Sequence, residues 1–222
     1  RMSALVHDIK TPLTVVRGNS ELLLETELTD EQKNYADYIS GSVLQIQNYV
    51  QTLIEVTKSQ EGISQAPVNV NVYDVLADIK KQTLGLSEVY QHQINWKEEL
   101  ESENSDSVIS VVYDHVVRAV MNVVRNAAEH TPKGSVINIT VTYSDGELAF
   151  TVEDSGSGFT PEGLAHGTEQ FFMDDSSRTG GSHYGIGLFF AKKVAEEHGG
   201  KIVLANSNET SGAKVEISFT SQ

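Results

Sequence analysis

The sequence contains no cysteine among its 222 residues. This absence excludes disulfide bridges and thiolate metal sites, and it is consistent with a reducing compartment. The sequence also lacks any run of about 18 consecutive apolar residues, so we expect no segment of it to span a membrane. Its histidines do not show the H-E-x-x-H spacing of a zinc site. Disulfide scaffolds, membrane spans and zinc enzymes of that type are therefore set aside.

Positive charge is scarce as well. The 16 Lys and Arg residues stand against 31 Asp and Glu residues, which gives a net charge of −15 at pH 7. This balance disfavours nucleic acid or an anionic membrane surface as the main partner, and we expect no nucleic-acid partner. A bound phosphate group would therefore need local positive features. The 39% of apolar residues is enough for one ordinary domain plus a smaller module.

Two amphipathic helices are predicted at the N-terminal end. Apolar residues recur at steps of three and four from Met2 to Leu23, the spacing of a helix that packs against others. A second helix is expected to begin after Thr29, because Thr29 and Gln32 can form a capping box. Joined by a short loop near residues 25–28, the two helices form an antiparallel hairpin that cannot bury two apolar stripes alone. We therefore expect a homodimer held by a four-helix bundle.

A polar stretch with Gly62 and Pro67 indicates a linker. It divides the chain into a helical domain at 1–60, a linker at 61–67 and a second domain at 68–222. In the second domain the patterns predict strands at 94–99, 107–112, 135–143, 147–153, 201–205 and 213–219, and helices at 73–90, 114–130 and 186–198. The tripeptide SDG between two of these strands predicts a hairpin turn. The stretch 159–184 has no periodicity and is a candidate lid or functional loop.

Three short segments of the second domain carry polar residues suited to a ligand. Asn122 and Asn126 lie one turn apart on a predicted helix and therefore share a face. Asp154 lies at the tip of a predicted strand, followed by Gly156 and Gly158, which allow backbone to approach a ligand closely. The third segment, GGSHYGIGL, leads into a helix whose first turn offers free N–H groups and a positive dipole end.

Each segment alone is weak evidence. A glycine-rich turn before a helix is more often only a turn, and a pair of asparagines on a helix is usually a polar face. The third segment is neither a Walker A loop nor a dinucleotide fingerprint. The order of the three segments within one mixed domain makes a shared site more probable than any of them does alone.

In that order the segments resemble the N, G1 and G2 boxes of the ATP-binding domain of sensor histidine kinases, a fold similar to those of gyrase B, MutL and the large heat-shock chaperone. The stretch VHDIKTPLT, residues 6–14, resembles the H box of that family. The predicted hairpin resembles its dimerisation and phosphotransfer domain. The resemblance therefore implies an α+β chain, in which a helical hairpin precedes an α/β-sandwich ATP-binding domain.

The resemblance also implies function and setting. It implies ATP and Mg²⁺ as cofactors, and a homodimer that serves a cognate response regulator as partner. Because the apolar pattern is already running at Met2, we expect the chain to be a fragment of something longer. In this family that would be the cytoplasmic part of a protein anchored in the inner or plasma membrane by an upstream sensor region.

In the H box, the resemblance implies that His7 accepts the γ-phosphoryl group of ATP. Asp8 resembles the acid that takes a proton from the histidine ring. Thr11, one turn after His7, matches the residue that positions a water when phosphate is removed from the partner regulator. Pro12 is tolerated because the helix of this family bends just beyond it.

In the nucleotide site, the resemblance makes Asn126 the magnesium ligand, with Asn122 beside it. Asp154 resembles the carboxylate that accepts a hydrogen bond from the adenine amino group. Gly185 and Gly187 would bring backbone N–H groups to the phosphates. The remaining residues that the resemblance assigns to the nucleotide site are Gly156, Gly158, Phe171, Phe172, Arg178, Gly181 and Leu188, with Arg178 reaching the γ-phosphate.

The sequence departs from the family at several positions. The lysine that often follows the metal-binding asparagine by three residues is Glu129 here, so Lys133 is the nearer candidate for a phosphate contact. His130 could stack on adenine or cap the helix. Thr168 and Met173 replace a phenylalanine and a basic residue of the lid motif.

Two rival functions stay open. An ATPase of the topoisomerase or chaperone type would need a glutamate on the helix of the two asparagines to activate water, and Glu129 stands three residues past Asn126, the wrong place by the family pattern. A scaffold that binds nucleotide without catalysis is the other, although His7 and Asp154 are both retained.

Overall fold

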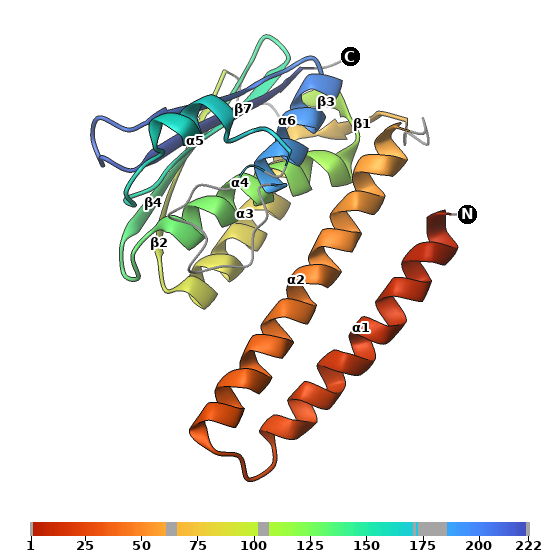
Figure 1. The fold of residues 1–222 in the computed structure, drawn as a ribbon. Helices are drawn as coiled ribbons and strands as arrows, with labels where there is room; N and C mark the ends of the chain where they lie inside the picture. The colour runs from red at the N-terminus through yellow and green to blue at the C-terminus, as the bar shows by residue number, and fades with distance from the viewer. Residues whose placement is uncertain (1, 61–65, 102–106, 171, 173–185, 221–222) are drawn as a thin grey trace. The chain divides into compact units, whose positions relative to one another are not determined.

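The computed structural model describes residues 2–60, 66–101, 107–170, 172 and 186–220. The chain divides into two compact units (Figure 1). The first holds the helices α1 (Met2–Leu24) and α2 (Asp30–Gln60). The second holds every strand and the remaining helices.

The first unit is the predicted antiparallel hairpin. α1 runs through Pro12 without ending, and residues 25–29 connect it to α2. The capping box is confirmed, since the Thr29 N–H donates to Gln32 Oε1 at 3.0 Å and the Gln32 N–H donates to Thr29 Oγ1 at 3.2 Å. The small side chains of Ser20 and Ala36 are buried where the two helices pack.

A second apolar stripe on the hairpin is not covered within the hairpin. Val16, Leu23, Ile39 and Ile46 are each between 44% and 49% exposed. Each lies three residues after a buried or half-buried position, which is about 60° round the helix from the seam between α1 and α2. Both helices thus carry large apolar side chains on a face beside that seam, where the hairpin alone does not cover them.

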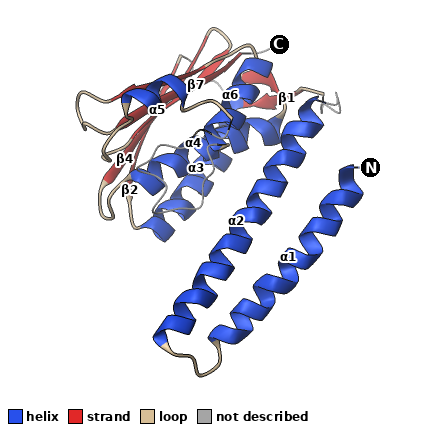
Figure 2. Ribbon diagram, in the orientation of Figure 1, coloured by secondary structure: helices blue, strands red, loops and turns tan. Residues whose placement is uncertain are grey.

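The second unit is a sheet with helices on one face (Figure 2). Its strands are β1 (Val68–Asn71), β2 (Gln93–Leu100), β3 (Val108–Val111), β4 (Val136–Ser144), β5 (Glu147–Glu153), β6 (Ile202–Asn206) and β7 (Ala213–Thr220). Its helices are α3 (Val72–Tyr90), α4 (Tyr113–His130), α5 (Pro161–His166) and α6 (Gly187–Glu197). Five strands form a sheet in the order β2-β4-β5-β7-β6, in which only β2 and β4 run parallel, and β1 pairs with β3 separately.

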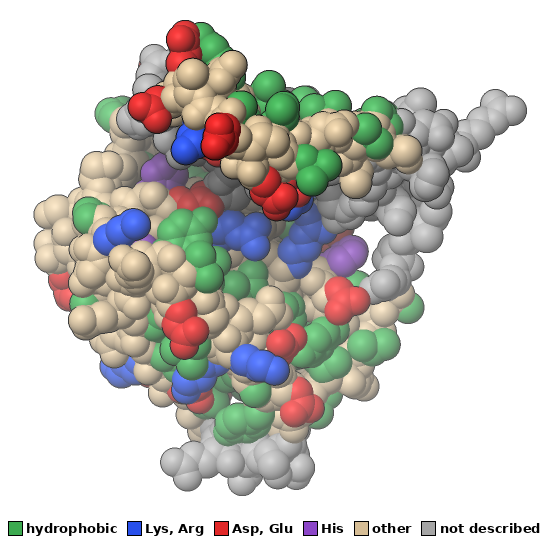
Figure 3. All heavy atoms as spheres, turned by 90° about the horizontal axis from the view of Figure 1, so that it is seen from below, with side chains coloured by type: hydrophobic (Ala, Val, Ile, Leu, Met, Phe, Trp, Pro, Cys, Tyr) green, Lys and Arg blue, Asp and Glu red, His purple; other side chains and the backbone are tan. Residues whose placement is uncertain are grey.

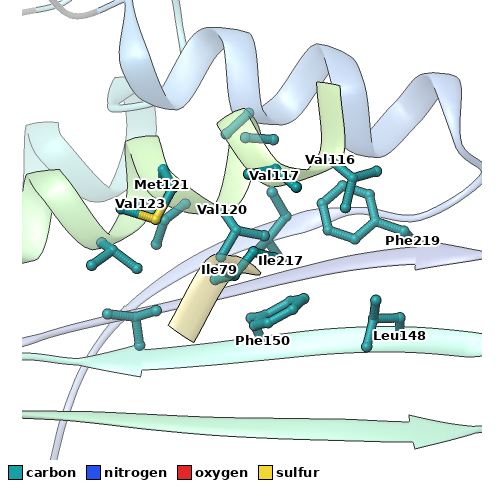
Figure 4. Packing of buried hydrophobic residues seen from close by; sticks show 14 of the residues in the cluster. Ile79, Val116, Val117, Val120, Met121, Val123, Leu148, Phe150, Ile217 and Phe219 are labelled. Atoms are coloured by element: carbon teal, nitrogen blue, oxygen red, sulfur yellow. The ribbon is translucent and has the colours of Figure 1, made fainter. Parts of the chain in front are cut away.

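The core lies between this sheet and the helices α3, α4 and α6. Every second residue of β5 is buried, which is the pattern of a sheet with one covered face. Phe150 and Ile217 point from the sheet toward Val120 of α4 and Ile79 of α3 (Figure 4). This packing fixes the C-terminal end of β5, where the candidate site begins.

The predicted strands and helices of the second unit agree with the structure to within one residue at each end. The predicted hairpin turn is confirmed, because Asp145 and Gly146 have φ of 49° and 77° and connect the antiparallel strands β4 and β5. Two short elements, β1 and α5, were not predicted. α5 begins inside the stretch predicted as a lid, where Thr160 caps it and Pro161 occupies its first turn.

None of the helices in the described ranges is long and apolar enough to cross a bilayer. Charged side chains of both signs lie interspersed with apolar ones on the face shown in Figure 3. On that face the acidic excess of the chain is not gathered into one patch.

Candidate functional site

Asp154 is the best defined residue of the candidate nucleotide site. It follows directly after β5 and is only 2% exposed. Its Oδ1 accepts hydrogen bonds from the N–H groups of Gly156 at 2.8 Å and Ala213 at 3.0 Å. Within the described ranges no hydrogen-bond donor to Oδ2 is found. One oxygen is therefore fixed by the protein and the other is left for a ligand.

The electrostatics of Asp154 reflect this placement. Burial raises the pKa of the carboxyl group above its usual value of 3.8. The N–H groups of Gly156 and Ala213, and the nearby His130, act in the opposite direction on this pKa. Burial thus removes water from the carboxylate, and the hydrogen bonds from two backbone N–H groups partly compensate for that loss.

The glycines after Asp154 are required by space and conformation. A Cβ on Gly156 would collide with the backbone carbonyl of His130, at the end of α4. Gly158 has a φ of 74°, and a Cβ there would lie 2.8 Å from Oδ1 of Asn206. Both therefore let the loop after β5 run close to its neighbours in the protein. The predicted close approach of this backbone to a ligand stays a prediction.

The turn between β6 and β7 completes the back of the site. The Thr210 hydroxyl donates to the backbone carbonyl of Asp154 at 2.6 Å. Gly212 packs so closely against the same carbonyl that a Cβ at position 212 would collide with it. The Asn206 side chain accepts from the Phe159 N–H at 2.7 Å and donates to the Phe159 carbonyl at 2.9 Å. No sequence motif indicates Asn206 or Thr210, because their partners lie 47 and 56 positions away in the chain.

The two asparagines share the face of α4 that meets the start of α6. Asn122 and Asn126 are both half-buried. A Cβ on Gly187 would lie 3.7 Å from the Cβ of Asn122, an ordinary contact distance, so the start of α6 lies against Asn122. Ile186, which precedes α6, provides no side-chain cap, and Leu188 is buried. Asn122 therefore lies beside Gly187, the last glycine of the glycine-rich segment.

Arg118 is a further cation on this face that the sequence analysis missed. It lies one turn before Asn122 on α4 and is half-buried. Its guanidinium carbon lies 4.5 Å from the ring centroid of Phe190 in α6, a cation–π contact. No motif indicates it, because the contact depends on how α4 and α6 pack.

Glu129 forms a hydrogen bond with a residue of α3, whereas His130 is exposed. The Tyr90 hydroxyl of α3 donates to Glu129 Oε1 at 2.9 Å. Burial, together with the charge and the hydrogen bond of Glu129, raises the pKa of Tyr90 to about 12. His130 and Lys133 are exposed, and the residue that caps the C-terminal end of α4 is Thr131, whose hydroxyl donates to Ala127 O at 2.7 Å. Capping by His130 is therefore not needed.

Several predicted residues have little or no structural description. Phe172 is half-buried, with its ring centroid 6.0 Å from that of His166. Thr11 is exposed on α1. His7 and Asp8 lie in α1, but their side chains are outside the described part of the chain. The residues that lie wholly outside the described ranges are Phe171, Arg178, Gly181 and Gly185, and their roles stay predictions.

Comparison with known proteins accounts for both units. Residues 2–62 match the His Kinase A (phospho-acceptor) domain, and residues 111–222 match the family of histidine kinase-, DNA gyrase B- and HSP90-like ATPases. The sensor histidine kinase SpaK of Bacillus subtilis is 32% identical over 217 residues, which cover 98% of this chain and 46% of SpaK. The nisin biosynthesis sensor protein NisK of Lactococcus lactis subsp. lactis is 30% identical over 218 residues, which cover 97% of this chain and 47% of NisK. The chain thus spans about half the length of these curated relatives.

Solved structures support the fold. Full-length ShkA in complex with AMPPNP superposes with a TM-score of 0.70 at 22% identity, covering 100% of this chain and 46% of ShkA. The catalytic domain of histidine kinase ThkA gives a TM-score of 0.58 at 20% identity, covering 70% of this chain and 96% of that domain. Since a phospho-acceptor domain and an ATP-binding domain follow one another along its length, the chain belongs to the sensor histidine kinases of two-component systems.

Proposed function

We propose that this chain binds ATP, phosphorylates itself on His7 and passes the phosphoryl group to an aspartate of a response regulator. The observation that carries the proposal is the arrangement of Asp154, a buried carboxylate with one oxygen held by two backbone N–H groups and the other left without a donor among the described residues. Such an oxygen suits a ligand that presents an N–H donor. The amino group of adenine is a donor of this kind, and the hydrogen bond would be charge-assisted.

The phosphates would lie toward the start of α6. The first turn of that helix has no side-chain cap, so its N–H groups and its dipole favour an anion. The helix starts at Gly187, which lies close to Asn122. The predicted phosphate contacts of Lys133, Arg178 and Gly185 belong to the same proposal.

Magnesium fits the residues available. Asn126 and Asn122 offer side-chain oxygens, which suit a hard cation. The described part of the chain holds no cluster of three or more His, Cys, Asp or Glu side chains that could bind a metal by itself. The ion would therefore depend on the ATP phosphates and water for its other ligands. When bound, it neutralises charge that develops on the transferred phosphoryl group.

The transfer itself exchanges one bond for another. The bond between the γ-phosphorus and the bridging oxygen of ATP breaks, a bond from a ring nitrogen of His7 to that phosphorus forms, and ADP leaves with the electron pair. Asp8 would accept the proton on the other ring nitrogen as the first becomes bonded. Thr11, one turn along the exposed helix, would orient the water that later removes phosphate from the regulator.

A homodimer is supported by the uncovered stripe on the hairpin. Val16, Leu23, Ile39 and Ile46 would be buried against the same residues of a second copy, giving the four-helix bundle. The proposed domain limits are 1–60 and 68–222, with the linker at 61–67. We place the whole protein at a membrane, anchored by an upstream sensor region, on the ground that the relatives named sensors are about twice as long as this chain.

The alternatives are less well supported. A glutamate that activates water would have to be free to reach the phosphates, whereas Glu129 accepts the Tyr90 hydroxyl of α3. A scaffold without catalysis would not need the adjacent His7 and Asp8.

Incubation with ATP labelled at the γ-phosphate separates the three functions. A kinase of this class incorporates label that is lost in acid and stable in alkali, because a nitrogen–phosphorus bond is formed. Release of free phosphate without a labelled protein would indicate an ATPase. Nucleotide binding with neither result would indicate a scaffold.

A further inference from the structure

The turn at residues 207–212, between β6 and β7, belongs to none of the recognised boxes. It is nevertheless strongly organised. The buried Ser207 accepts hydrogen bonds at its hydroxyl from the N–H groups of Glu209 at 3.2 Å and Thr210 at 3.3 Å. The Ser207 N–H donates to the Gly212 carbonyl at 2.8 Å, which closes the turn. The position of Thr210 is thus fixed from within the turn.

Thr210 connects this turn to Asp154. Its hydroxyl donates to the Asp154 carbonyl at 2.6 Å and accepts from the Gly212 N–H at 3.2 Å. The Asp154 N–H in turn donates to the Ala213 carbonyl at 2.9 Å. Both backbone groups of Asp154 are therefore held, one by β7 and the other by a single side-chain hydroxyl.

Among the described residues the Asp154 carbonyl has no other donor. Without the Thr210 hydroxyl, the Asp154 carbonyl would lose this hydrogen bond, and the peptide after Asp154 could rotate more easily, because Gly156 and Gly158 make the following loop permissive. A rotation of this peptide displaces the Gly156 N–H, one of the two donors that hold Oδ1, and so changes where Oδ2 points. Binding groups must be held to within about 0.5 Å to act on a ligand atom.

We propose that Thr210 is a positioning residue for the base of the nucleotide. Its hydroxyl fixes the Asp154 backbone and thereby directs Oδ2 at the exocyclic amino group of a 6-aminopurine. This inference rests on the proposed function, in which Asp154 accepts that amino group. It makes the selection of adenine depend on a turn that follows Asp154 by more than 50 residues in the chain.

A purely structural role for Thr210 predicts a different outcome from a positioning role. If the hydroxyl only holds the turn together, its loss weakens every nucleotide alike. If it directs Oδ2, its loss weakens only ligands that carry the amino group. A pair of ligands that differ in this one group, ATP and purine riboside triphosphate, separates the two roles.

The test is calorimetric binding of both ligands, with Mg²⁺, to the parent chain and to Thr210→Val, Thr210→Ser and Glu209→Ala. Valine keeps the shape of threonine without the hydroxyl, serine keeps the hydroxyl, and Glu209 is an exposed residue of the same turn that serves as the control. We expect the parent chain to bind ATP more tightly than purine riboside triphosphate. Thr210→Val should bind ATP about threefold to tenfold more weakly than the parent does, as for the loss of one hydrogen bond. Purine riboside triphosphate should bind equally well to the parent and to Thr210→Val. Serine and the control should behave as the parent.

Equal weakening of both ligands, or unchanged ATP affinity, would overturn the role of Thr210 while leaving that of Asp154 intact. A parent that binds both ligands equally would instead contradict the role of Asp154, and the inference would fall with it. If Thr210→Val does not fold, Thr210→Ala removes the hydroxyl with less bulk and is judged by the same comparison.

Discussion

Replacement of Asp154 by asparagine tests the nucleotide site most sharply, because it changes one atom of the carboxylate. The amide oxygen can keep the hydrogen bonds from the Gly156 and Ala213 N–H groups, so the NH₂ group must take the place of Oδ2. A donor would then face the donor of adenine. The flipped amide is no better, since its NH₂ would face two backbone N–H groups. We expect ATP binding to weaken by about 1 to 3 kcal/mol, or about 5-fold to 150-fold in Kd.

The same variant should be as stable as the parent or more stable, although it binds ATP more weakly. Burial raises the pKa of Asp154, so the folded chain binds this proton more readily than the unfolded chain does. The stabilising contribution of such a group is present below its unfolded pKa and is lost as the pH rises through the folded pKa. At pH 7 the ionised carboxylate therefore costs stability, and the neutral amide does not. Without nucleotide, Asp154→Asn should melt at the same temperature as the parent or higher, and this difference should shrink as the pH falls through the raised pKa toward 3.8.

Two measurements on each protein are needed. Calorimetry gives the ATP affinity, and thermal unfolding followed by the single tryptophan, Trp96 in β2, reports the second unit. Unchanged ATP affinity would refute the role of Asp154, and so would a parent that binds ATP and GTP equally. A melting temperature that falls together with the affinity would show that the substitution acts through folding.

Three further predictions concern other parts of the chain. Thr11→Ala should slow removal of phosphate from the regulator while keeping much of the autophosphorylation and the melting temperature, and equal dephosphorylation by parent and variant would remove Thr11 from the mechanism. Ile46→Asp should weaken the dimer in light scattering, because it would bury an unpaired charge, whereas a monomeric parent would contradict the proposed dimer. His198 Nε2 accepts a hydrogen bond from the Val112 N–H at 3.0 Å, and His198 Nδ1 lies within hydrogen-bond distance of Val194 O at 2.7 Å. His198→Ala should therefore lower the free energy of unfolding by about 1 to 3 kcal/mol, because it leaves the buried Val112 N–H unpaired. An unchanged melting temperature would refute that account.

The fold was predictable where side chains repeat with the period of an element. β5 alternates between buried and half-buried or exposed residues, and α4 buries one broad face, so both were found from the sequence. β1 and α5 are too short for a period to emerge, and they depend on pairing with β3 and on the Thr160 cap. Local signals were reliable where the chemistry is local, as in the capping box at Thr29.

The site was predictable only in part, for the same reason. Asp154 and its glycines form one short segment with a recognisable order. Thr210 and the pairing of Glu129 with Tyr90 join residues far apart in the chain, 56 positions in the first case and 39 in the second. Nothing in the sequence near Thr210 indicates that its hydroxyl meets a carbonyl at the end of another strand.

The central claim is that the acceptor lies on the helical hairpin and the nucleotide site lies in the other unit. His7→Gln tests it directly, with label from γ-labelled ATP and ATP affinity measured on the same preparation. The account predicts that the variant incorporates no acid-labile, alkali-stable label while it binds ATP as tightly as the parent. Label that persists on His7→Gln would contradict it.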